Sequence, residues 1–472
     1  MKKILLVNSH LEIEKLVKGE MPPIGLGYIA AVLEREGFEV SILDLIICED
    51  PRKSLQGCIK KFSPDIVGIS FASANRFQAF EVARWVKEID ENILVVVGGP
   101  HITFTAEDTL KNVKEVDIVG RGEGEHVMLD IAMEKKLEDI KGISFRKNNR
   151  VIHNLTQPPI KNLDDLPIPA YHLFDMNRYK LIMPFIKNYE AATISTMRGC
   201  PYGCNFCSCT AMWGRYPRTL SPEKILENIR LLTDDYRVNS FYFIDETFTL
   251  HKRKCSELCQ KIVDEKLDIR WMTDVRVNEV DRGILKSMKR AGCYMVAYGV
   301  ESGNQKIIDK IGKSITLKQV LDCTKICGEL GIKRKAFFTF GLPGDTKETI
   351  METYNFRKKL EAEIKTMSVI NIFPGTQVEN IARINGCLVK DFSWSREFYE
   401  PYHLVFFTPS SVPLFYQPHL SKKELAFFYM KYIAEKKPIS GQIKKAIKRT
   451  RSFNDMKAVL NYGVGYLKAK MT

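Results

Sequence analysis

Three cysteines of one short segment have the spacing of a metal-cluster loop. The segment reads Arg198-Gly-Cys-Pro-Tyr-Gly-Cys-Asn-Phe-Cys, so three residues separate Cys200 from Cys204 and two separate Cys204 from Cys207. Iron–sulfur clusters are held by cysteine thiolates, usually four for a [4Fe–4S] cluster. The glycines and the proline between the cysteines favour a tight loop. The pattern predicts a [4Fe–4S] cluster with three protein ligands; three unrelated buried thiols or an incomplete zinc site are the alternatives.

An iron that lacks a protein thiolate can bind a small molecule through an amino and a carboxylate group. The methionine end of S-adenosylmethionine carries both groups. Chelation there would place the sulfonium beside the cluster, where one electron could cleave a carbon–sulfur bond. We therefore expect S-adenosylmethionine to bind the iron that the three cysteines leave open.

The other cysteines are expected to be ordinary core residues. The chain has twelve cysteines in 472 residues, and nothing at its start predicts export, so they do not indicate a disulfide scaffold. The pairs Cys255/Cys259 and Cys323/Cys327 have helical spacing in amphipathic segments. Together with Cys209, they are interpreted as core-facing thiols rather than ligands of a second cluster.

Residues 1–145 alternate short β-branched runs with amphipathic stretches, which predicts a doubly wound, parallel-sheet α/β domain. The expected strands cover residues 3–7, 40–43, 66–70, 93–97 and 116–119. Such sheets bind ligands at the carboxyl ends of their strands. Asn8, Ser70, Gly98 and Gly99 occupy those positions and are the candidate binding residues. No G-x-G-x-x-G fingerprint follows the first strand, which argues against a dinucleotide.

The rest of the chain divides into three further parts. Four prolines mark residues 146–188 as an irregular linker, and residues 189–390 then show six strand–helix units, typical of a partial (β/α)6 barrel. Residues 391–472 are expected to form a small, basic, mainly helical C-terminal region. The active site of such a barrel lies at the carboxyl ends of its strands.

Beyond the cysteines, several segments resemble the cobalamin-dependent branch of the radical S-adenosylmethionine family, over roughly residues 1–380. These segments are the cluster motif with Phe206 before its last cysteine, Phe-Ile-Asp-Glu-Thr-Phe at 243–248, Arg-Val-Asn-Glu-Val at 276–280, Gly-Val-Glu-Ser-Gly at 299–303, Phe-Gly-Leu-Pro-Gly-Asp at 340–345 and Pro-Gly-Thr at 374–376. The branch contains bacteriochlorophyll ring-forming and hopanoid-methylating enzymes. The resemblance implies a cobalamin-binding, Rossmann-like domain in front of the barrel.

The resemblance also implies roles for individual residues. Phe206 and Glu246 would lie at S-adenosylmethionine, with Glu246 meeting its amino group. Glu301 and Ser302 occupy the ribose-contacting place, and a carboxylate suits ribose hydroxyls. Arg276 would grip the methionine carboxylate, because a guanidinium binds carboxylates bidentately. Surface ion pairs are the alternative for these charged residues.

The cobalamin prediction departs from one common pattern. Domains that supply a histidine to cobalt usually carry D-x-H-x-x-G after the first strand, whereas this chain reads Asn8-Ser-His10-Leu-Glu-Ile. No aspartate is present to orient the histidine. We therefore expect cobalt without a histidine ligand, with His10 as the alternative.

The implied function is C-methylation of an unactivated carbon, using a 5′-deoxyadenosyl radical and methylcobalamin. A radical oxidative cyclase, or another rearrangement without methyl transfer, is the alternative enzyme. A cobalamin-responsive binding protein is the alternative outside enzymes, although a sensor has no need of an open iron. A methylthiotransferase acting on transfer RNA would need three cluster cysteines in the front domain, where only Cys48 and Cys58 occur.

The distribution of charge along the chain indicates what the protein could bind. The net charge is +14, and residues 421–472 hold 13 Lys and Arg against 3 Asp and Glu. With Phe427, Phe428, Tyr429 and Tyr432, this tail suggests peripheral membrane contact and a lipid-like or other small-molecule substrate. A solvated helical surface is the alternative, and nucleic acid is not favoured. We expect a cytoplasmic, oxygen-sensitive enzyme that takes electrons from a flavodoxin or ferredoxin.

Overall fold

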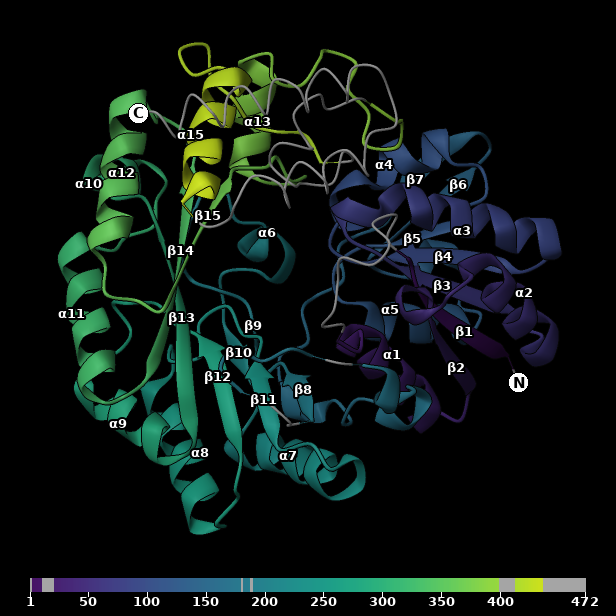
Figure 1. The fold of residues 1–472 in the computed structure, drawn as a ribbon. Helices are drawn as coiled ribbons and strands as arrows, with labels where there is room; N and C mark the ends of the chain where they lie inside the picture. Colours follow the sequence, from purple (N-terminus) through teal and green to yellow (C-terminus); the bar gives the residue numbers. More distant parts are fainter. Residues whose placement is uncertain (1, 11–20, 180, 187–189, 399–411, 436–472) are drawn as a thin grey trace.

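The structure is a computed structural model, and it describes residues 2–10, 21–179, 181–186, 190–398 and 412–435. Two α/β units stand side by side, the front unit on the right of Figure 1 and the barrel unit on the left. Both units are built on parallel sheets, which confirms the predicted fold class.

The front unit has a seven-stranded sheet in the order β2-β1-β3-β4-β5-β6-β7. Its strands are β1 (Lys3–Asn8), β2 (Glu39–Asp44), β3 (Ile66–Ser70), β4 (Leu94–Gly98), β5 (Ile118–Gly120), β6 (Ile143–Lys147) and β7 (Arg150–His153). The first five strands of that order are parallel and the last two are antiparallel. Strands of this kind need a helix on each face, because both faces are apolar.

Alternate residues of the central strands face opposite helical layers. In β1, Leu5 and Val7 join the core under α2 (Pro51–Phe62), α3 (Arg76–Ile89) and α4 (Ile102–Asn112). Ile4 and Leu6 join the opposite core, under α1 (Ile24–Arg35) and α5 (Gly124–Ala132). The period of two in strands therefore explains why runs such as Ile-Leu-Leu-Val are apolar throughout.

The front sheet continues beyond residue 145, into the segment expected to be a linker. Strands β6 and β7 form a hairpin whose two turn residues, Asn148 and Asn149, have φ of 50° and 60°. Asparagine tolerates this left-handed conformation, and such two-residue turns match the twist of a hairpin. The Asn-Asn pair is the sequence signal for this extension.

The barrel unit has six parallel strands in the order β8-β11-β12-β13-β14-β15. The strands are β8 (Ala191–Ile194), β11 (Ser240–Phe243), β12 (Arg270–Asp274), β13 (Cys293–Glu301), β14 (Lys333–Phe340) and β15 (Ile364–Val369). The outer helices are α7 (Pro222–Tyr236), α8 (Lys252–Asp264), α9 (Arg282–Arg290), α10 (Gln305–Lys310), α11 (Leu317–Glu329) and α12 (Lys347–Lys359). β8 and β15 are edge strands, so the barrel is open on the side of the front unit (Figure 1).

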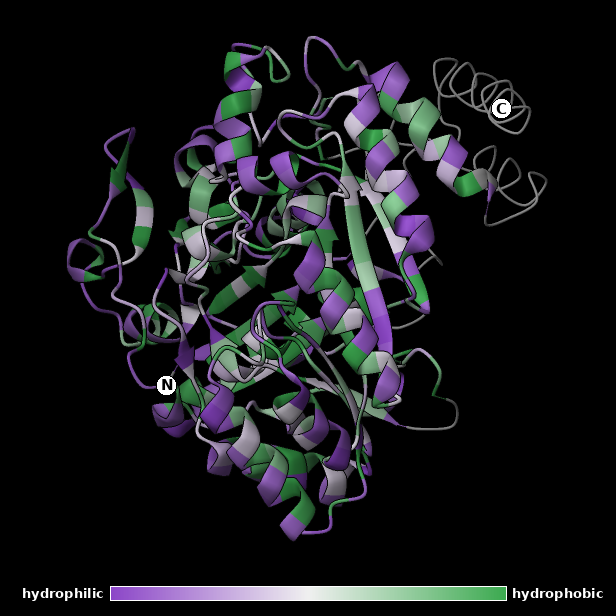
Figure 2. Cartoon of the chain, turned by 90° about the vertical axis from the view of Figure 1, so that its left-hand side faces the viewer, coloured by the Kyte–Doolittle hydropathy of each residue, from purple (hydrophilic) through white to green (hydrophobic). Residues whose placement is uncertain are grey.

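The outer helices follow their sequence signals. Ser221 and Thr316 cap α7 and α11 by accepting hydrogen bonds from Lys224 and Gln319 N–H, and Pro222 occupies the first turn of α7. Figure 2 shows hydrophilic and hydrophobic residues alternating along these helices. Each helix can therefore bury one face against the strands while the other faces solvent.

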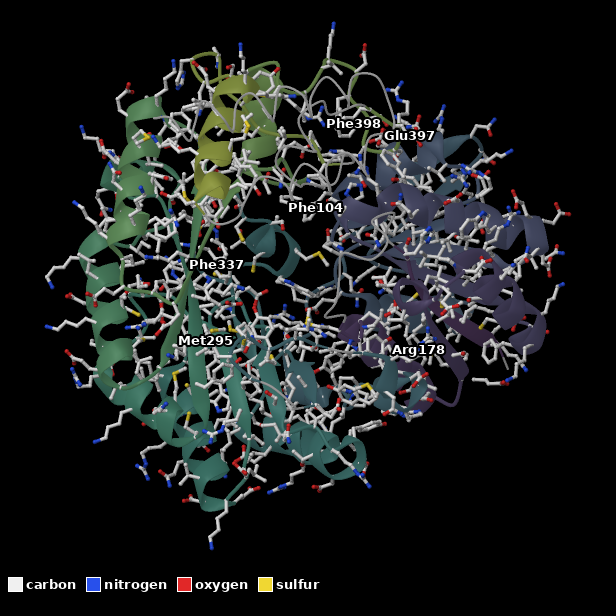
Figure 3. The ribbon with its side chains drawn as sticks, viewed as in Figure 1. Phe104, Arg178, Met295, Phe337, Glu397 and Phe398 are labelled. Atoms are coloured by element: carbon white, nitrogen blue, oxygen red, sulfur yellow. The ribbon has the colours of Figure 1, made fainter. Side chains whose placement is uncertain are left out.

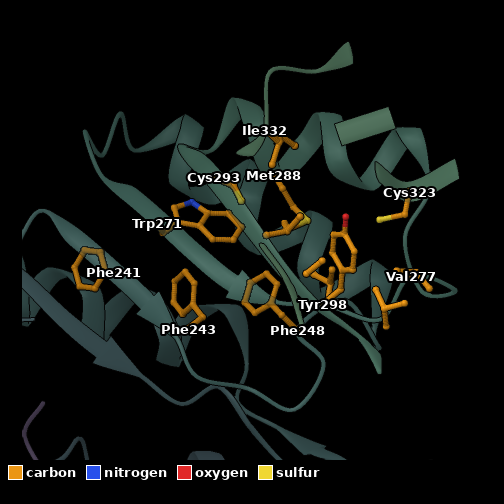
Figure 4. Packing of buried hydrophobic residues seen from close by; sticks show 14 of the residues in the cluster. Phe241, Phe243, Phe248, Trp271, Val277, Met288, Cys293, Tyr298, Cys323 and Ile332 are labelled. Atoms are coloured by element: carbon orange, nitrogen blue, oxygen red, sulfur yellow. The ribbon is translucent and has the colours of Figure 1, made fainter. Parts of the chain in front are cut away.

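The core between the barrel strands and helices is rich in aromatic side chains (Figure 4). Trp271 lies edge-on to Phe243, with 5.2 Å between ring centroids, and its indole N–H donates to the Ala291 carbonyl at 2.6 Å. The four cysteines at helical spacing, Cys255, Cys259, Cys323 and Cys327, belong to this core. Their predicted role as core-facing thiols is confirmed.

The two units share hydrophobic core at the base of the molecule. Tyr28 of α1 packs in the same cluster as Leu163 and Tyr171 of the connecting segment and Ile225 of α7. A second part of the connecting segment enters the barrel, where Met183 packs with Met272 and Met295. Helix α1 therefore contributes to the core of both units, and Met183 fills the inner face of the barrel.

The C-terminal region adds α13 (Gln377–Ile384) and α15 (Lys422–Ala434) beside β15 (Figure 1). Phe428, Tyr429 and Tyr432 of α15 are buried in the barrel core, and Phe427 packs against it. These aromatic residues stabilise the fold, so they do not support the expected contact with lipid, which stays a prediction. The basic residues from 436 onward lie outside the described residues. Among the described helices, none has the length and apolarity needed to cross a membrane.

Candidate active site

The cysteine loop comes after β8 and is held against two other segments. After β9 (Met197–Arg198), Gly199 has φ of +98°, and a Cβ there would lie 2.9 Å from the Tyr216 carbonyl oxygen. Cys200 N–H donates to the Gly214 carbonyl at 3.3 Å, and Asn205 N–H donates to the Ile311 carbonyl at 3.0 Å. The loop therefore has one fixed path between its neighbours.

A second glycine brings the segment after α10 against the loop. Gly312 has φ of +70°, and a Cβ at this position would lie 2.8 Å from the Gly203 carbonyl oxygen. Any side chain at Gly312 would push on the peptide that precedes Cys204. The glycine is thus required by both conformation and space.

The cluster thiols lie close enough to influence one another. Partial desolvation by the surrounding loop raises the pKa of the Cys207 thiol, and the neighbouring Cys204 and Cys200 add to this effect. The pKa of Cys200 is lowered, first by a hydrogen bond from Cys209 and then by the positive charge of Arg276. Iron binding needs thiolates, so positive charge beside the loop favours the ligand form.

Cys209 was expected to face the core, but it lies at the site. It is the first residue of α6 (Cys209–Trp213), its N–H donates to Cys207 Sγ at 3.5 Å, and its thiol is a hydrogen-bond partner of Cys200 and Glu246. The helix is a single turn that directs its first side chain back toward the loop. Its position two residues after Cys207 was the available sequence signal.

The donor set fits a cluster better than a single metal ion. In the described part of the chain, no group of three His, Cys, Asp or Glu side chains converges on one metal position. The ligands of a [4Fe–4S] cluster bind different irons, so they surround the cluster and need not converge. Three thiols on one loop, with cationic groups nearby, match the cluster.

Two acidic residues after β11 have different surroundings. Asp245 is buried and accepts hydrogen bonds from Thr196 and Met197 N–H at 2.6 and 3.0 Å; burial raises its pKa to about 7. It fixes the chain just before the cluster loop. Glu246 is half-buried, and its Oε2 has no hydrogen-bond partner among the described residues. A buried carboxylate oxygen without a partner suits an incoming ammonium group, as predicted for Glu246.

Arg276 lies against the cluster loop. Its Nη1 is 4.0 Å from Cys204 Sγ, its Nη2 donates to the Lys313 carbonyl, and its guanidinium carbon is 3.4 Å from the centroid of the Tyr202 ring. The predicted contact with the methionine carboxylate stays a prediction. The structure places Arg276 beside a cluster ligand, a position that the sequence did not indicate.

The predicted ribose residues lie at the carboxyl end of β13. Glu301 accepts from Lys313 Nζ at 2.7 Å and from the Thr339 hydroxyl at 3.0 Å, so its carboxylate is already paired. Ser302 is completely buried and bonds Thr353 Oγ1 at 2.9 Å. The serine holds the loop to α12, and its predicted contact with ribose stays a prediction. Lys313 is the residue at this place that sequence reasoning missed.

Phe206 anchors the cysteine loop to a hydrophobic cluster. The ring packs against a cluster that contains Ile311, Leu342 and Ile372. It thereby ties the loop between Cys204 and Cys207 to the carboxyl ends of β14 and β15. The predicted contact between Phe206 and S-adenosylmethionine stays a prediction.

Three of the candidate residues in the front unit lie in one row. Asn8 is the register partner of Ser70, and Ser70 is the register partner of Gly98, at the carboxyl ends of β1, β3 and β4. The strand order reverses between β1 and β3, which is where such sheets bind ligands. Gly99 has φ of +109°, and a Cβ there would lie 2.7 Å from the Phe71 carbonyl oxygen. Glycine is therefore required at position 99 by both conformation and space.

The surroundings of the row fit a polar cofactor tail. A Cβ at Gly98 would have nothing within 4 Å, and the buried Ser9 Oγ and His101 Nε2 have no hydrogen-bond partner among the described residues. Asn8, by contrast, donates to Asp44 Oδ1 at 2.9 Å. His10 stacks on Trp85 of α3, with 5.6 Å between ring centroids. The expectation that cobalt lacks a histidine ligand stays a prediction.

A buried ion-pair network joins the front unit to the cluster loop. Arg198, two residues before Cys200, donates to Glu125 Oε1 at 2.6 Å and lies 3.4 Å from Glu123 Oε1. Arg218 also pairs with Glu123, at 2.7 Å. Glu123 and Glu125 belong to the segment after β5, so the carboxyl edge of the front sheet is fixed to the cluster loop. Nothing in the sequence pattern predicts this pairing.

The opposite side of the site is closed by a second contact. A Cβ at Gly375, which follows β15, would lie 2.5 Å from the Phe104 ring of α4. Ser395 N–H donates to Asp108 Oδ2 at 2.9 Å. In Figure 3, Phe104 lies on the side of the front unit that faces the barrel strands bearing Phe337 and Met295. The carboxyl edge of the front sheet and the barrel are therefore joined by fixed contacts on two sides.

The chain matches two protein families in the predicted order. Residues 15–132 match the B12 binding domain and residues 194–357 match the radical SAM superfamily. These matches confirm the predictions of a cobalamin domain and of a cluster that works with S-adenosylmethionine.

Individual relatives agree with both matches. An uncharacterized methyltransferase of Pyrococcus horikoshii is 36% identical over 82% of this chain and 84% of its own length. The anaerobic magnesium-protoporphyrin IX monomethyl ester cyclase of Rubrivivax gelatinosus is 28% identical over 76% of this chain, which spans 66% of the cyclase. The structure of the radical S-adenosylmethionine methyltransferase TsrM from Kitasatospora setae, with cobalamin and a [4Fe–4S] cluster bound, superimposes with a TM-score of 0.71 at 17% identity, covering 100% of this chain and 99% of TsrM. The chain belongs to the cobalamin-dependent radical S-adenosylmethionine enzymes.

Proposed function

We propose that this enzyme methylates an unactivated carbon of a small molecule. The observation that carries the proposal is the fixed opposition of two edges, the cysteine loop and the Asn8–Ser70–Gly98 row, through the Arg198–Glu125 ion pair. A methyl carrier and a radical source must act on the same carbon. They can do so only if the protein holds both against one substrate position.

The residues of the chain would bind and orient the groups that perform the reaction. When bound, the cluster supplies one electron, S-adenosylmethionine supplies a methyl group and the 5′-deoxyadenosyl radical, and cobalamin supplies a methyl carrier. Cys200, Cys204 and Cys207 would hold the cluster. Glu246 would accept from the ammonium group and Glu301, oriented by Lys313, from the ribose hydroxyls.

Methyl transfer is supported over cyclisation by the comparison of relatives. The relative named as a methyltransferase shares 36% of its residues across 84% of its length, against 28% across 66% for the cyclase. A larger share of the methyltransferase than of the cyclase is therefore represented here. Radical cyclisation or oxidation without methyl transfer is the second candidate, because the cyclase is also similar to this chain, at 28% identity over 76% of this chain's length.

The partners follow from the same site. Cys207 is the exposed member of the cluster ligands, so we propose that a flavodoxin or ferredoxin delivers electrons from its side. The substrate would be a small molecule. The aromatic residues that suggested lipid contact belong to the barrel core or pack against it, so they do not support a membrane-bound lipid as the substrate.

The test uses full-length protein, purified without oxygen and supplied with iron, sulfide and hydroxocobalamin. It is incubated with S-adenosylmethionine labelled as CD3 at its methyl group and with a strong reductant, and the bound cobalamin is examined by mass spectrometry. We expect cobalamin to gain the CD3 group. Formation of 5′-deoxyadenosine while cobalamin stays unlabelled would instead favour the cyclase.

A further inference from the structure

We propose that Arg276 sets the reduction potential of the cluster by donating a hydrogen bond to the sulfur of Cys204. This inference rests on the proposed function, because it requires the cluster. It assigns Arg276 to the cluster itself, in place of the methionine carboxylate that the family resemblance implied.

The guanidinium is held by contacts on several sides. Nη1 lies 4.0 Å from Cys204 Sγ, Nη2 donates to the Lys313 carbonyl, and the guanidinium carbon lies 3.4 Å from the Tyr202 ring centroid. The Tyr202 hydroxyl is in turn fixed by a hydrogen bond to Glu279. Arg276 is 8% exposed, so this arrangement is largely shielded from water. Both terminal nitrogens are therefore already directed at protein atoms.

The charge of Arg276 is not cancelled by a contacting carboxylate. Lys313, the neighbouring cation, pairs with Glu301 at 2.7 Å, whereas Arg276 forms no ion pair within 4 Å among the described residues. Arg276 is thus the cation that acts most directly on the thiolates.

The effect on the cluster follows from electrostatics. Reduction adds one negative charge to the cluster, and hydrogen bonds to its sulfur ligands are one of the factors that set its potential. A buried cation that donates to a ligand sulfur stabilises the reduced form more than the oxidised form. Arg276 therefore raises the potential and eases the entry of the electron that cleaves S-adenosylmethionine.

The experiment is a redox titration of the cluster, followed by electron paramagnetic resonance, in full-length protein without S-adenosylmethionine. At the midpoint potential of the unsubstituted enzyme, we expect Arg276→Gln to lower the ratio of reduced to oxidised cluster about tenfold, which is a shift of about 59 mV for a one-electron couple. Arg276→Lys keeps the positive charge but cannot donate to both Cys204 Sγ and the Lys313 carbonyl. In this variant the ratio of reduced to oxidised cluster should therefore fall by less than tenfold. Arg282→Gln removes an exposed arginine that pairs with Glu329 on the outer layer and should leave the ratio unchanged.

The possible results separate the inference from the proposed function. An unchanged midpoint in Arg276→Gln, together with weaker binding of S-adenosylmethionine, would assign Arg276 to the carboxylate and overturn the inference. If Arg276→Gln does not assemble a cluster, the midpoint potentials of Arg276→Lys and Tyr202→Leu test the inference instead. Tyr202→Leu removes the ring that holds the guanidinium and keeps the guanidinium itself. Unchanged midpoint potentials in both variants would also overturn the inference. Absence of a cluster signal in the unsubstituted enzyme would overturn the proposed function itself.

Discussion

Glu125 anchors the cluster loop to the front unit, and its replacement by alanine should destabilise the protein. Glu125 is 3% exposed, and its partner Arg198, 2.6 Å away, is 8% exposed. Removing one partner of a buried ion pair costs about 3–5 kcal/mol, because the other charge stays buried. Arg198 keeps Glu123 at 3.4 Å and the Tyr28 ring at 5.4 Å, so we expect the lower end, about 3 kcal/mol.

The assay is urea unfolding of the cofactor-free protein, with two comparison variants. Glu88→Ala removes a carboxylate that pairs with Arg52 at 2.8 Å on the exposed surface, and it should cost less than about 1 kcal/mol. The double variant Glu125→Leu with Arg198→Met removes both buried charges, so it should recover part of the loss. Losses of equal size in Glu125→Ala and Glu88→Ala would refute this reasoning.

Three further predictions concern the cluster loop and its supports. Gly312→Ala should lower the iron content after reconstitution, because its Cβ would lie 2.8 Å from the cysteine loop. The control is Gly386→Ala, which has the same φ of +70° but nothing within 4 Å of the added Cβ. It should strain the backbone and leave the iron content unchanged. Burial raises the pKa of Asp245 to about 7, so the folded state binds the proton more tightly than the unfolded state does. The free energy of unfolding should therefore fall as the pH rises from 4 to 7. Urea unfolding should show a smaller fall in Asp245→Asn, which has no carboxyl group to titrate at this position. Cys327→Ala, in the core at 0% exposure, should lower the free energy of unfolding and keep the iron, which colorimetric iron assay can check.

The sequence was sufficient for the elements and their order, because their signals are local. Runs such as Ile66–Ser70 are short, apolar on both faces and rich in β-branched residues, which is typical of buried parallel strands. The cysteine spacing identified the cluster loop for the same reason, since all three ligands lie within eight residues. The hairpin at Asn148 and Asn149 was also locally encoded, but it lay among the prolines that indicated a linker.

The site partners could not be read from the sequence, because they come from distant segments. Lys313 reaches Glu301 from the turn after α10, and Glu125 reaches Arg198 across 73 positions of chain. Neither pair has a periodic pattern that a sequence can display. The aromatic residues of α15 show the opposite error. Their composition suggests contact with lipid, but Phe428, Tyr429 and Tyr432 are buried in the barrel core.

The most direct test of the account is the link between the three cysteines and cleavage of S-adenosylmethionine. Reconstituted protein, without oxygen and with dithionite, is assayed for bound iron and for 5′-deoxyadenosine by mass spectrometry, alongside Cys204→Ala. We predict about four irons per chain and 5′-deoxyadenosine in the unsubstituted enzyme, and loss of the product in Cys204→Ala. A protein that binds no iron, or a Cys204→Ala variant that cleaves S-adenosylmethionine as fast as the unsubstituted enzyme, would contradict it.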